Sequence, residues 1–295
     1  MSAKQVIELD VVQADALAFN GAALLVVGNF KSGKTVLAAT ASKDAPAKLD
    51  PKNKTLLSDI LFLQFEPGGI RSATSLGLVP KHVIDFAAPK YRIAQDPAAE
   101  ADKSKTSNEL LLDWTKIRPA LLASAKYVES NPEIKIVVVD NLSRYCEMLE
   151  YHFQQTCKKN GATDTFEVYS QIKKANIWLA NLFINQRVLL IALSHVKSAA
   201  AQDEAKLQAK SVGGDLTTLV PAIPAGSAGF WSGFADAVLC TMRIKKKVGT
   251  EEKYEYRTLM TSSSKLPSGN RFGLEGSIES HLGPILNKYY SELHR

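Results

Sequence analysis

The chain has 295 residues, of which 45% are hydrophobic and 22% charged, an ordinary composition for a globular protein with one large α/β domain or two small ones. Its net charge of +6 fits either simple solubility or a polyanionic partner, and its 3 scattered cysteines exclude a disulfide framework or a zinc site. The sequence has no apolar run of about 18 residues and no leader pattern at its start, so we expect a cytoplasmic protein that crosses no membrane.

The most informative stretch is G-N-F-K-S-G-K-T at 28–35, which follows the apolar run 22–27. We expect a buried strand, a glycine-rich loop and then a helix that runs to about residue 42. Such an arrangement directs several backbone N–H groups at an anion bound at the start of the helix. The pattern G-x-x-x-x-G-K-[ST] predicts a nucleoside triphosphate site, in which Lys34 reaches the β- and γ-phosphates and the Thr35 hydroxyl binds Mg²⁺. The residues expected to line the nucleotide are Gly28, Asn29, Phe30, Lys31, Ser32, Gly33, Lys34, Thr35 and Val36.

The rest of the chain alternates strand-like and helix-like segments. Residues 1–20 are interpreted as an N-terminal arm and residues 21–295 as one domain. Further strands are expected at the apolar runs 60–65, 134–139 and 188–193, of which 60–65 is suited to burial on both faces, and at the short segment 83–86. Helices are expected at segments with helical spacing of apolar residues, namely 110–128 (with an interruption at Pro119), 142–157 and 166–183.

Two more strands, 235–244 and 255–261, are separated by a basic turn and are predicted to pair antiparallel. Alternation of strands and helices before them indicates an α/β fold with a mostly parallel, twisted sheet flanked by helices. Two polar segments interrupt the pattern. Residues 87–108 are interpreted as a mobile surface insertion, and 197–228 is a long connection of the kind that is usually functional or disordered.

Acidic residues follow two of the predicted strands. Asp140 ends the strand 134–139 and fits the Walker B role, in which an acid holds Mg²⁺ through water. Glu66 closes the strand 60–65, which we expect beside the phosphate-loop strand, and is the candidate to orient and deprotonate the attacking water. A solvated turn residue is the alternative for Glu66.

Polar residues also follow the strand 188–193. Ser194 or His195 is positioned to sense a γ-phosphate, because ligands bind at the carboxyl ends of parallel strands. His195 is equally compatible with a loop histidine that is hydrogen-bonded for structural reasons.

Taken in order, these features resemble the RecA-type ATPase core. The phosphate loop is followed by a strand ending in an acid, an apolar strand ending in Asp, a polar strand end with a long loop, paired strands, and K-x-x-x-G-x-R-F-G at 265–273. The resemblance covers roughly 20–290 and includes RecA/RadA recombinases and DnaB-type hexameric helicases. The chain looks most similar to short single-domain RecA-like ATPases of bacteriophages, which include single-strand annealing proteins.

The resemblance implies roles for individual residues. Glu66 corresponds to the catalytic base and Asp140 to the Mg²⁺-linked acid. Ser194 and His195 fall where recombinases keep an Asn-Gln pair, a departure that affects how nucleotide and DNA are coupled. Lys265 and Arg271 match cationic fingers that reach the ATP of an adjacent subunit. A basic turn exposed to water is the alternative for these two residues.

The resemblance also implies a partner and an assembly. The loops 158–165 and 197–228 correspond to those that hold single-stranded DNA, and their expected phosphate contacts are Lys158, Lys159, Lys197, Lys206 and Lys210. The aromatic residues Phe230, Trp231 and Phe234 are available for base stacking, although core packing is the more ordinary use of such residues.

The function implied is a Mg²⁺-dependent, DNA-stimulated ATPase that binds single-stranded DNA in phage recombination. It would form a ring or filament with ATP at the subunit interface, in the host cytoplasm if phage-encoded. The alternative is a hexameric helicase or DNA-translocating motor with the same core. A P-loop kinase is less favoured because no Arg-rich lid is evident. A GTPase is disfavoured because N-K-T-L at 53–56 lacks the Asp of a guanine-reading motif.

Overall fold

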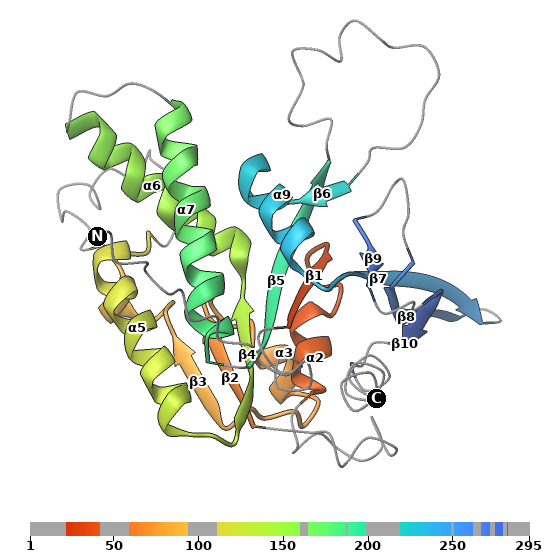
Figure 1. Ribbon diagram of the computed structural model, residues 1–295. Coiled ribbons are helices and arrows are strands. Elements are labelled where there is room, and N and C mark those ends of the chain that lie inside the picture. The colour runs from red at the N-terminus through yellow and green to blue at the C-terminus, as the bar shows by residue number, and fades with distance from the viewer. Residues whose placement is uncertain are drawn as a thin grey trace, which may run out of the picture.

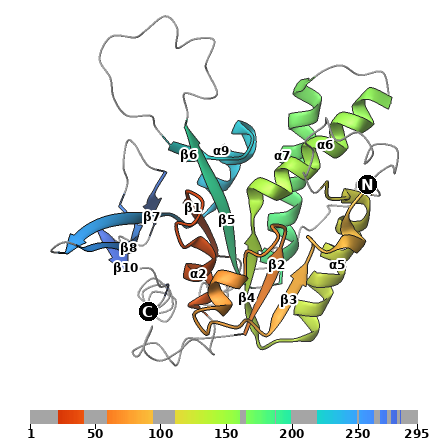
Figure 2. The same ribbon diagram turned by 180° about the vertical axis from the view of Figure 1, so that it is seen from behind.

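The computed structural model describes residues 22–41, 59–93, 111–159, 165–186, 188–198, 219–248, 251–261, 267–271, 275–279 and 282. Within them, one sheet has the strand order β10-β8-β7-β1-β5-β4-β2-β3, with β6 paired to β5 and β9 to β7. Figure 2 shows this order, from the paired β7 and β8 on one side to β3 on the other. The expected N-terminal arm, 1–20, lies outside the described residues.

The secondary structure alternates as expected (Figure 1). The strands are β1 (Ala23–Gly28), β2 (Asp59–Gln64), β3 (His82–Asp85), β4 (Ile134–Asp140), β5 (Leu189–Ser198), β6 (Leu219–Pro221), β7 (Ala237–Val248), β8 (Glu251–Leu259), β9 (Gly269–Asn270) and β10 (Ser277–Glu279). The helices are α2 (Lys34–Ala39), α3 (Arg71–Thr74), the 3₁₀ turn η1 (Pro89–Tyr91), α5 (Trp114–Ser130), α6 (Leu142–Lys159), α7 (Thr165–Ile184) and α9 (Ala225–Phe234).

The predicted fold class is confirmed. Strands β3, β2, β4, β5, β1 and β7 pair in parallel, whereas β8, β9 and β10 are antiparallel additions. Successive residues of a strand point to opposite faces, so Leu25 and Val27 join a cluster beneath α5, α6, α7 and α9, while Leu24 and Val26 join a second cluster with α2 and α3. Burial on both faces explains why these strands read as continuous apolar runs.

The expected position of the strand before Glu66 is wrong. That strand is β2, and it pairs with β4 and β3, so that β5 and β4 both lie between it and β1. The strand that Asp140 ends, β4, is likewise separated from β1 by β5. After β4 the chain forms the helices α6 and α7, and it then returns to the sheet as β5, which pairs with β1.

Two helices differ from expectation. The predicted interruption at Pro119 is wrong, because α5 continues through it as one helix that begins at Trp114, after the Asp113 side chain caps the Thr115 N–H. Burial of Ile117, Leu121 and other residues of one face outweighs the single hydrogen bond that proline removes. Helix α2 is shorter than expected and ends at Ala39.

The two polar segments are partly built into the fold. Residues 87–93 form a turn in which Ala87 is buried and the Ile93 N–H donates to the Leu111 carbonyl. In the stretch 197–228, β5 extends to Ser198 and the chain returns as β6 and α9. Residues 94–108 and 199–218 lie outside the described residues.

Helix α9 carries the aromatic residues considered for DNA stacking, and they pack in the core as the ordinary alternative expected. Trp231 is fully buried, and its indole N–H donates to the Asn176 carbonyl oxygen at 2.8 Å. Asn176, also fully buried, donates to the Ile172 carbonyl at 2.9 Å and to the Ser227 hydroxyl at 3.3 Å. One side chain thus joins α7 to α9. Among the described helices, none is long and apolar enough to cross a membrane.

This junction generates a stability prediction. We expect Asn176→Ala to lower the free energy of unfolding by on the order of 2–3 kcal/mol, because the Trp231 N–H and Ser227 hydroxyl lose a buried partner. Asn181→Ala, at an exposed position of the same helix, should change it by less than about 0.5 kcal/mol. Urea denaturation of both variants measures the difference, and equal stabilities would contradict the role of Asn176.

Candidate nucleotide site

The loop between β1 and α2 is held against β7. A Cβ on Gly28 would collide with the side-chain oxygens of Thr241 and Ser32, which explains the glycine. The two hydroxyls of Ser32 and Thr241 are hydrogen-bonded to each other at 2.7 Å. Gly33 has φ 91°, a left-handed conformation that glycine adopts without strain. The loop therefore has a fixed backbone, with its N–H groups at the start of α2.

Lys34 lies inside this loop. Its ammonium donates to the Gly28 and Asn29 carbonyls, each at 2.9 Å, and the residue is only 7% exposed. Burial lowers the pKa of Lys34 to about 8, although the carboxylates of Asp140 and Glu66 act in the opposite direction. At pH 7 the side chain therefore remains charged, held where an anion bound by the loop would meet it.

Thr35 and Asp140 meet across the sheet edge. The Thr35 hydroxyl donates to Asp140 Oδ2 at 2.8 Å. Burial raises the pKa of Asp140 to about 6, against the hydrogen bond from Thr35 and the charge of Lys34, so the group is still a carboxylate at pH 7. A Cβ on Gly69 would lie 2.9 Å from Asp140 Oδ2, so that glycine leaves room for the carboxylate. A hydroxyl beside a carboxylate fits Mg²⁺, which binds few protein oxygens and completes its shell with water and phosphate.

Glu66 reaches the site although its strand is distant from β1. The chain bends toward β4 after β2, where the Phe65 N–H donates to the Asp140 carbonyl at 2.6 Å. Glu66 then accepts a short hydrogen bond from the Asn141 side-chain amide. The hydrogen bond from His195 lowers the pKa of Glu66 and outweighs the effect of burial. Glu66 is thus a half-exposed carboxylate near neutral pH, available to a water molecule.

His195 lies between the loop and Glu66. Its Nδ1 is 3.2 Å from the Lys34 ammonium, and its Nε2 is 3.3 Å from Glu66 Oε2. An ammonium only donates, so Nδ1 accepts, and the proton on Nε2 is donated to Glu66. The Phe30 ring stacks on the imidazole with centroids 3.9 Å apart. Hydrogen bonds therefore connect the loop lysine to the carboxylate through one imidazole.

Ser194 faces the other way. It is fully buried, and its hydroxyl lies 3.2 Å from that of Ser143, so of the predicted pair only His195 faces the loop. Both residues lie inside β5 and not at its end, because the strand leaves β1 and continues to pair with β6. Of the loop residues, Asn29, Phe30 and Lys31 are exposed, while Val36 is half-buried in the first turn of α2.

The other predicted residues lie apart from this cluster. Arg271 donates to the Gly233 carbonyl at 2.7 Å and lies 3.4 Å from an Asp236 carboxylate oxygen. Since the other Asp236 oxygen accepts from the Ala23 N–H, Arg271 lies at the amino end of β1, opposite the loop. Lys158 is exposed on α6 and Lys197 half-buried on β5. Lys206, Lys210 and Lys265 lie outside the described residues, and the side chain of Lys159 is not described either.

Asn141, which is not among the residues predicted from the sequence, contacts both Glu66 and His195. Its position directly after Asp140 was the available signal.

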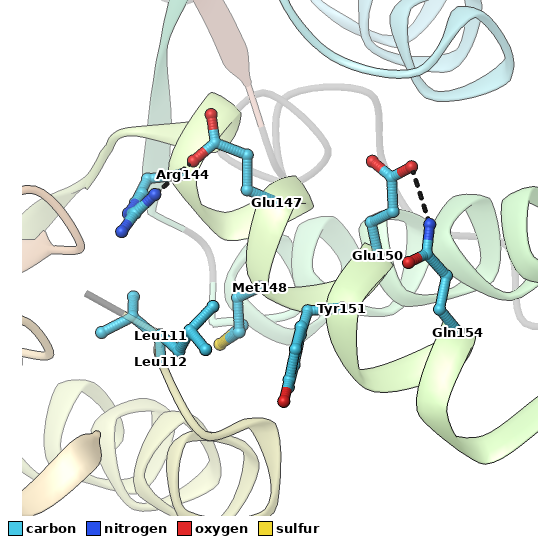
Figure 3. A pocket seen from close by; sticks show the side chains of 8 residues that line it. All are labelled: Leu111, Leu112, Arg144, Glu147, Met148, Glu150, Tyr151 and Gln154. Atoms are coloured by element: carbon cyan, nitrogen blue, oxygen red, sulfur yellow. Dashed lines mark hydrogen bonds and ion pairs between the residues drawn. The ribbon is translucent and has the colours of Figure 1, made fainter. Parts of the chain in front are cut away.

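A pocket of about 380 Å³ opens beside α6. Figure 3 shows its polar wall, where Arg144 pairs with Glu147 and Gln154 donates to Glu150. The residues that line the pocket are Leu111, Leu112, Arg144, Glu147, Met148, Glu150, Tyr151 and Gln154.

Comparisons with known proteins add little to this geometry. No family model matches the chain, and no curated protein matches it. Among solved structures, it is similar to a KaiC-like protein of the hyperthermophilic archaeon Pyrococcus horikoshii OT3, with a TM-score of 0.42 and 15% identity over 88% of this chain and 84% of that one. A likeness at this level does not determine the function of this chain.

Asp140 gives a prediction in which stability and activity change in opposite directions. Its pKa is raised from 3.8 to about 6, so the ionised group destabilises the folded state at pH 7. Asp140→Asn keeps an acceptor for Thr35 and removes the charge. The free energy of unfolding should therefore rise, by up to about 3 kcal/mol at pH 7 and by less at pH 5, while nucleotide hydrolysis is lost.

Urea denaturation at the two pH values, with the exposed substitution Glu133→Gln as a control, measures this effect. A variant that is less stable at pH 7 and still hydrolyses nucleotide would contradict the placement of Asp140.

Proposed function

We propose that this protein is a Mg²⁺-dependent ATPase with a RecA-like core. The observation that carries the proposal is the convergence of four groups from separate elements at one edge of the sheet: the Lys34 ammonium, the Thr35 hydroxyl, and the carboxylates of Asp140 and Glu66. An anion cradle, a hydroxyl–carboxylate pair and a second carboxylate that can accept a proton from water are what hydrolysis of a nucleoside triphosphate requires.

Each group has a role that follows from its surroundings. The loop N–H groups and Lys34 bind and orient the phosphates, and the ammonium offsets the charge that builds up on the transferred group. Thr35 and Asp140 would hold Mg²⁺, which supplies Lewis-acid polarisation of phosphate oxygens when bound. Glu66 accepts the proton of the attacking water, and Asn141 and His195 hold its carboxylate in place.

His195 also connects binding to hydrolysis. A phosphate in the loop competes with His195 Nδ1 for the Lys34 ammonium, because both are acceptors. When Lys34 turns to the phosphate, the imidazole can accept from another donor while its Nε2–H still faces Glu66.

Adenine is favoured over guanine as the base of the nucleotide, because the sequence has no guanine-reading motif.

Steady-state ATP hydrolysis and equilibrium ATP binding together test the proposal. Lys34→Ala should abolish hydrolysis and weaken binding strongly, because the loop loses its cation. Glu66→Gln should lower turnover by at least about 100-fold, since an amide is no proton acceptor, while ATP affinity stays within a few-fold. Glu129→Gln, exposed at the end of α5, is the matched control. Unchanged turnover in Lys34→Ala would reject the phosphate-loop assignment.

We further propose that the ATPase acts on single-stranded DNA as a homo-oligomer of recombination or annealing type. Two features support this. Two parts of the fold project beyond the same edge of the sheet (Figure 1): the end of α6 with the start of α7, and the paired strands β5 and β6. Lys158 lies on α6 and Lys197 on β5. Arg271 lies at the opposite edge from its own loop, so a role at a nucleotide would require the nucleotide of another subunit.

DNA dependence gives a separate prediction. Oligo(dT) should stimulate hydrolysis, and Lys158→Ala combined with Lys197→Ala should weaken DNA binding and reduce the slope of log affinity against log salt by about 0.7 per lost phosphate contact. Lys126→Ala, exposed on α5, should leave that slope unchanged. Fluorescence anisotropy over a salt series measures it, and an unaltered slope in the double variant would contradict these contacts.

A further inference from the structure

The paired strands β7 and β8 extend past the nucleotide site. β1 ends at Gly28, which is paired with Thr241 of β7. From there β7 continues to Val248, paired along its length with β8. The residues of β7 after Thr241, and the β8 residues paired with them, therefore lie beyond the carboxyl end of β1, on the side of the phosphate loop.

One face of this extension is turned toward the loop. Thr241, which bonds Ser32 of the loop, is paired with Thr258. Because alternate residues share a face, the next row on that face is Arg243 with Tyr256, followed by the row that contains Tyr254. We call Arg243, Tyr254 and Tyr256 the hairpin face.

Tyr256 lies directly against the phosphate loop. Its ring carbon is 3.2 Å from the position that a Cβ on Gly33 would occupy, and the side chain is nevertheless 39% exposed. The Arg243 guanidinium lies over the Tyr254 ring, 3.5 Å from its centroid, as a cation–π pair. An aromatic ring thus borders the loop, with a fixed positive charge next to it.

The positions of the carboxylates give the direction in which a bound nucleotide runs. Glu66 and Asp140 come from β2 and β4, on one side of β1, so the terminal phosphate must lie toward that side. β7 and β8 are on the other side of β1. The nucleoside end of the same molecule therefore points away from the carboxylates and toward the hairpin face.

We propose that the hairpin face is the nucleoside subsite, in which the base stacks on Tyr256 and the Arg243–Tyr254 pair forms the outer wall. This rests on the proposed nucleotide site. Aromatic rings and guanidinium planes both stack on bases, and stacking is tolerant of base identity. The subsite would thus add affinity for the nucleoside, while the loop and carboxylates act on the phosphates.

The experiment compares two ligands, MgATP and Mg²⁺-tripolyphosphate, which share the phosphates and differ in the nucleoside. Tyr256→Ala should raise the Kd for ATP by about ten-fold or more, as expected for a lost stacking contact, and leave the Kd for tripolyphosphate within about two-fold. Tyr256→Phe should bind ATP like the natural protein, because stacking does not need the hydroxyl. Tyr169→Ala, exposed on α7, is the control and should change neither Kd.

Several outcomes would overturn the proposal. Equal weakening of both ligands by Tyr256→Ala would show that Tyr256 only supports the loop at Gly33. Unchanged ATP affinity together with weaker oligo(dT) binding would assign the hairpin face to nucleic acid. Failure of the natural protein to bind ATP would reject the nucleotide site itself, whereas ATP binding that depends on Lys34 and not on Tyr256 would reject the subsite alone.

Discussion

The structure of the site depends on holding one ammonium and two carboxylates together at a largely buried edge of the sheet. Burial favours the neutral form of both Lys34 and Asp140, and it moves the pKa of each toward neutrality, to about 8 and about 6. Both groups nevertheless remain charged at pH 7. The carboxylates of Asp140 and Glu66 oppose the effect of burial on Lys34, and the Thr35 hydrogen bond together with the Lys34 charge opposes it on Asp140. Glycine is needed at 28, where Thr241 and Ser32 leave no room for a Cβ, and at 69, where the Asp140 carboxylate leaves little.

The order of the strands explains how the cluster forms. β5 is inserted between β1 and β4, and its register pairs His195 with Gly28, at the entrance of the phosphate loop. A histidine at that position contacts the loop lysine on one side and Glu66 on the other. Strand β5 thus separates β1 from β2 and β4, the strands that lead to Glu66 and Asp140, and it places the His195 imidazole between them. In the proposed ATPase, one side chain would then connect phosphate binding to water activation.

The sequence was sufficient to predict the fold class, most strands and helices, and the strand–loop–helix around residues 28–35, because buried parallel strands and glycine-rich loops have strong local patterns. It did not predict the strand order, since pairing is set by contacts distant in the chain, and Glu66 was therefore expected beside β1. Pro119 was misread as an interruption because packing of the apolar face of α5 overrides one lost hydrogen bond. Asn141 and Tyr256 carry no motif, and only the folded structure shows that Asn141 contacts Glu66 and that Tyr256 lies against Gly33.

The most direct measurement is an experimental structure with Mg²⁺ and a non-hydrolysable ATP analogue. The account predicts that the Lys34 ammonium leaves the Gly28 and Asn29 carbonyls for the phosphates, that Mg²⁺ binds the Thr35 hydroxyl with Asp140 nearby, and that Glu66 faces the terminal phosphate. A nucleotide bound elsewhere, or Lys34 still hydrogen-bonded to its own loop with the nucleotide present, would contradict it.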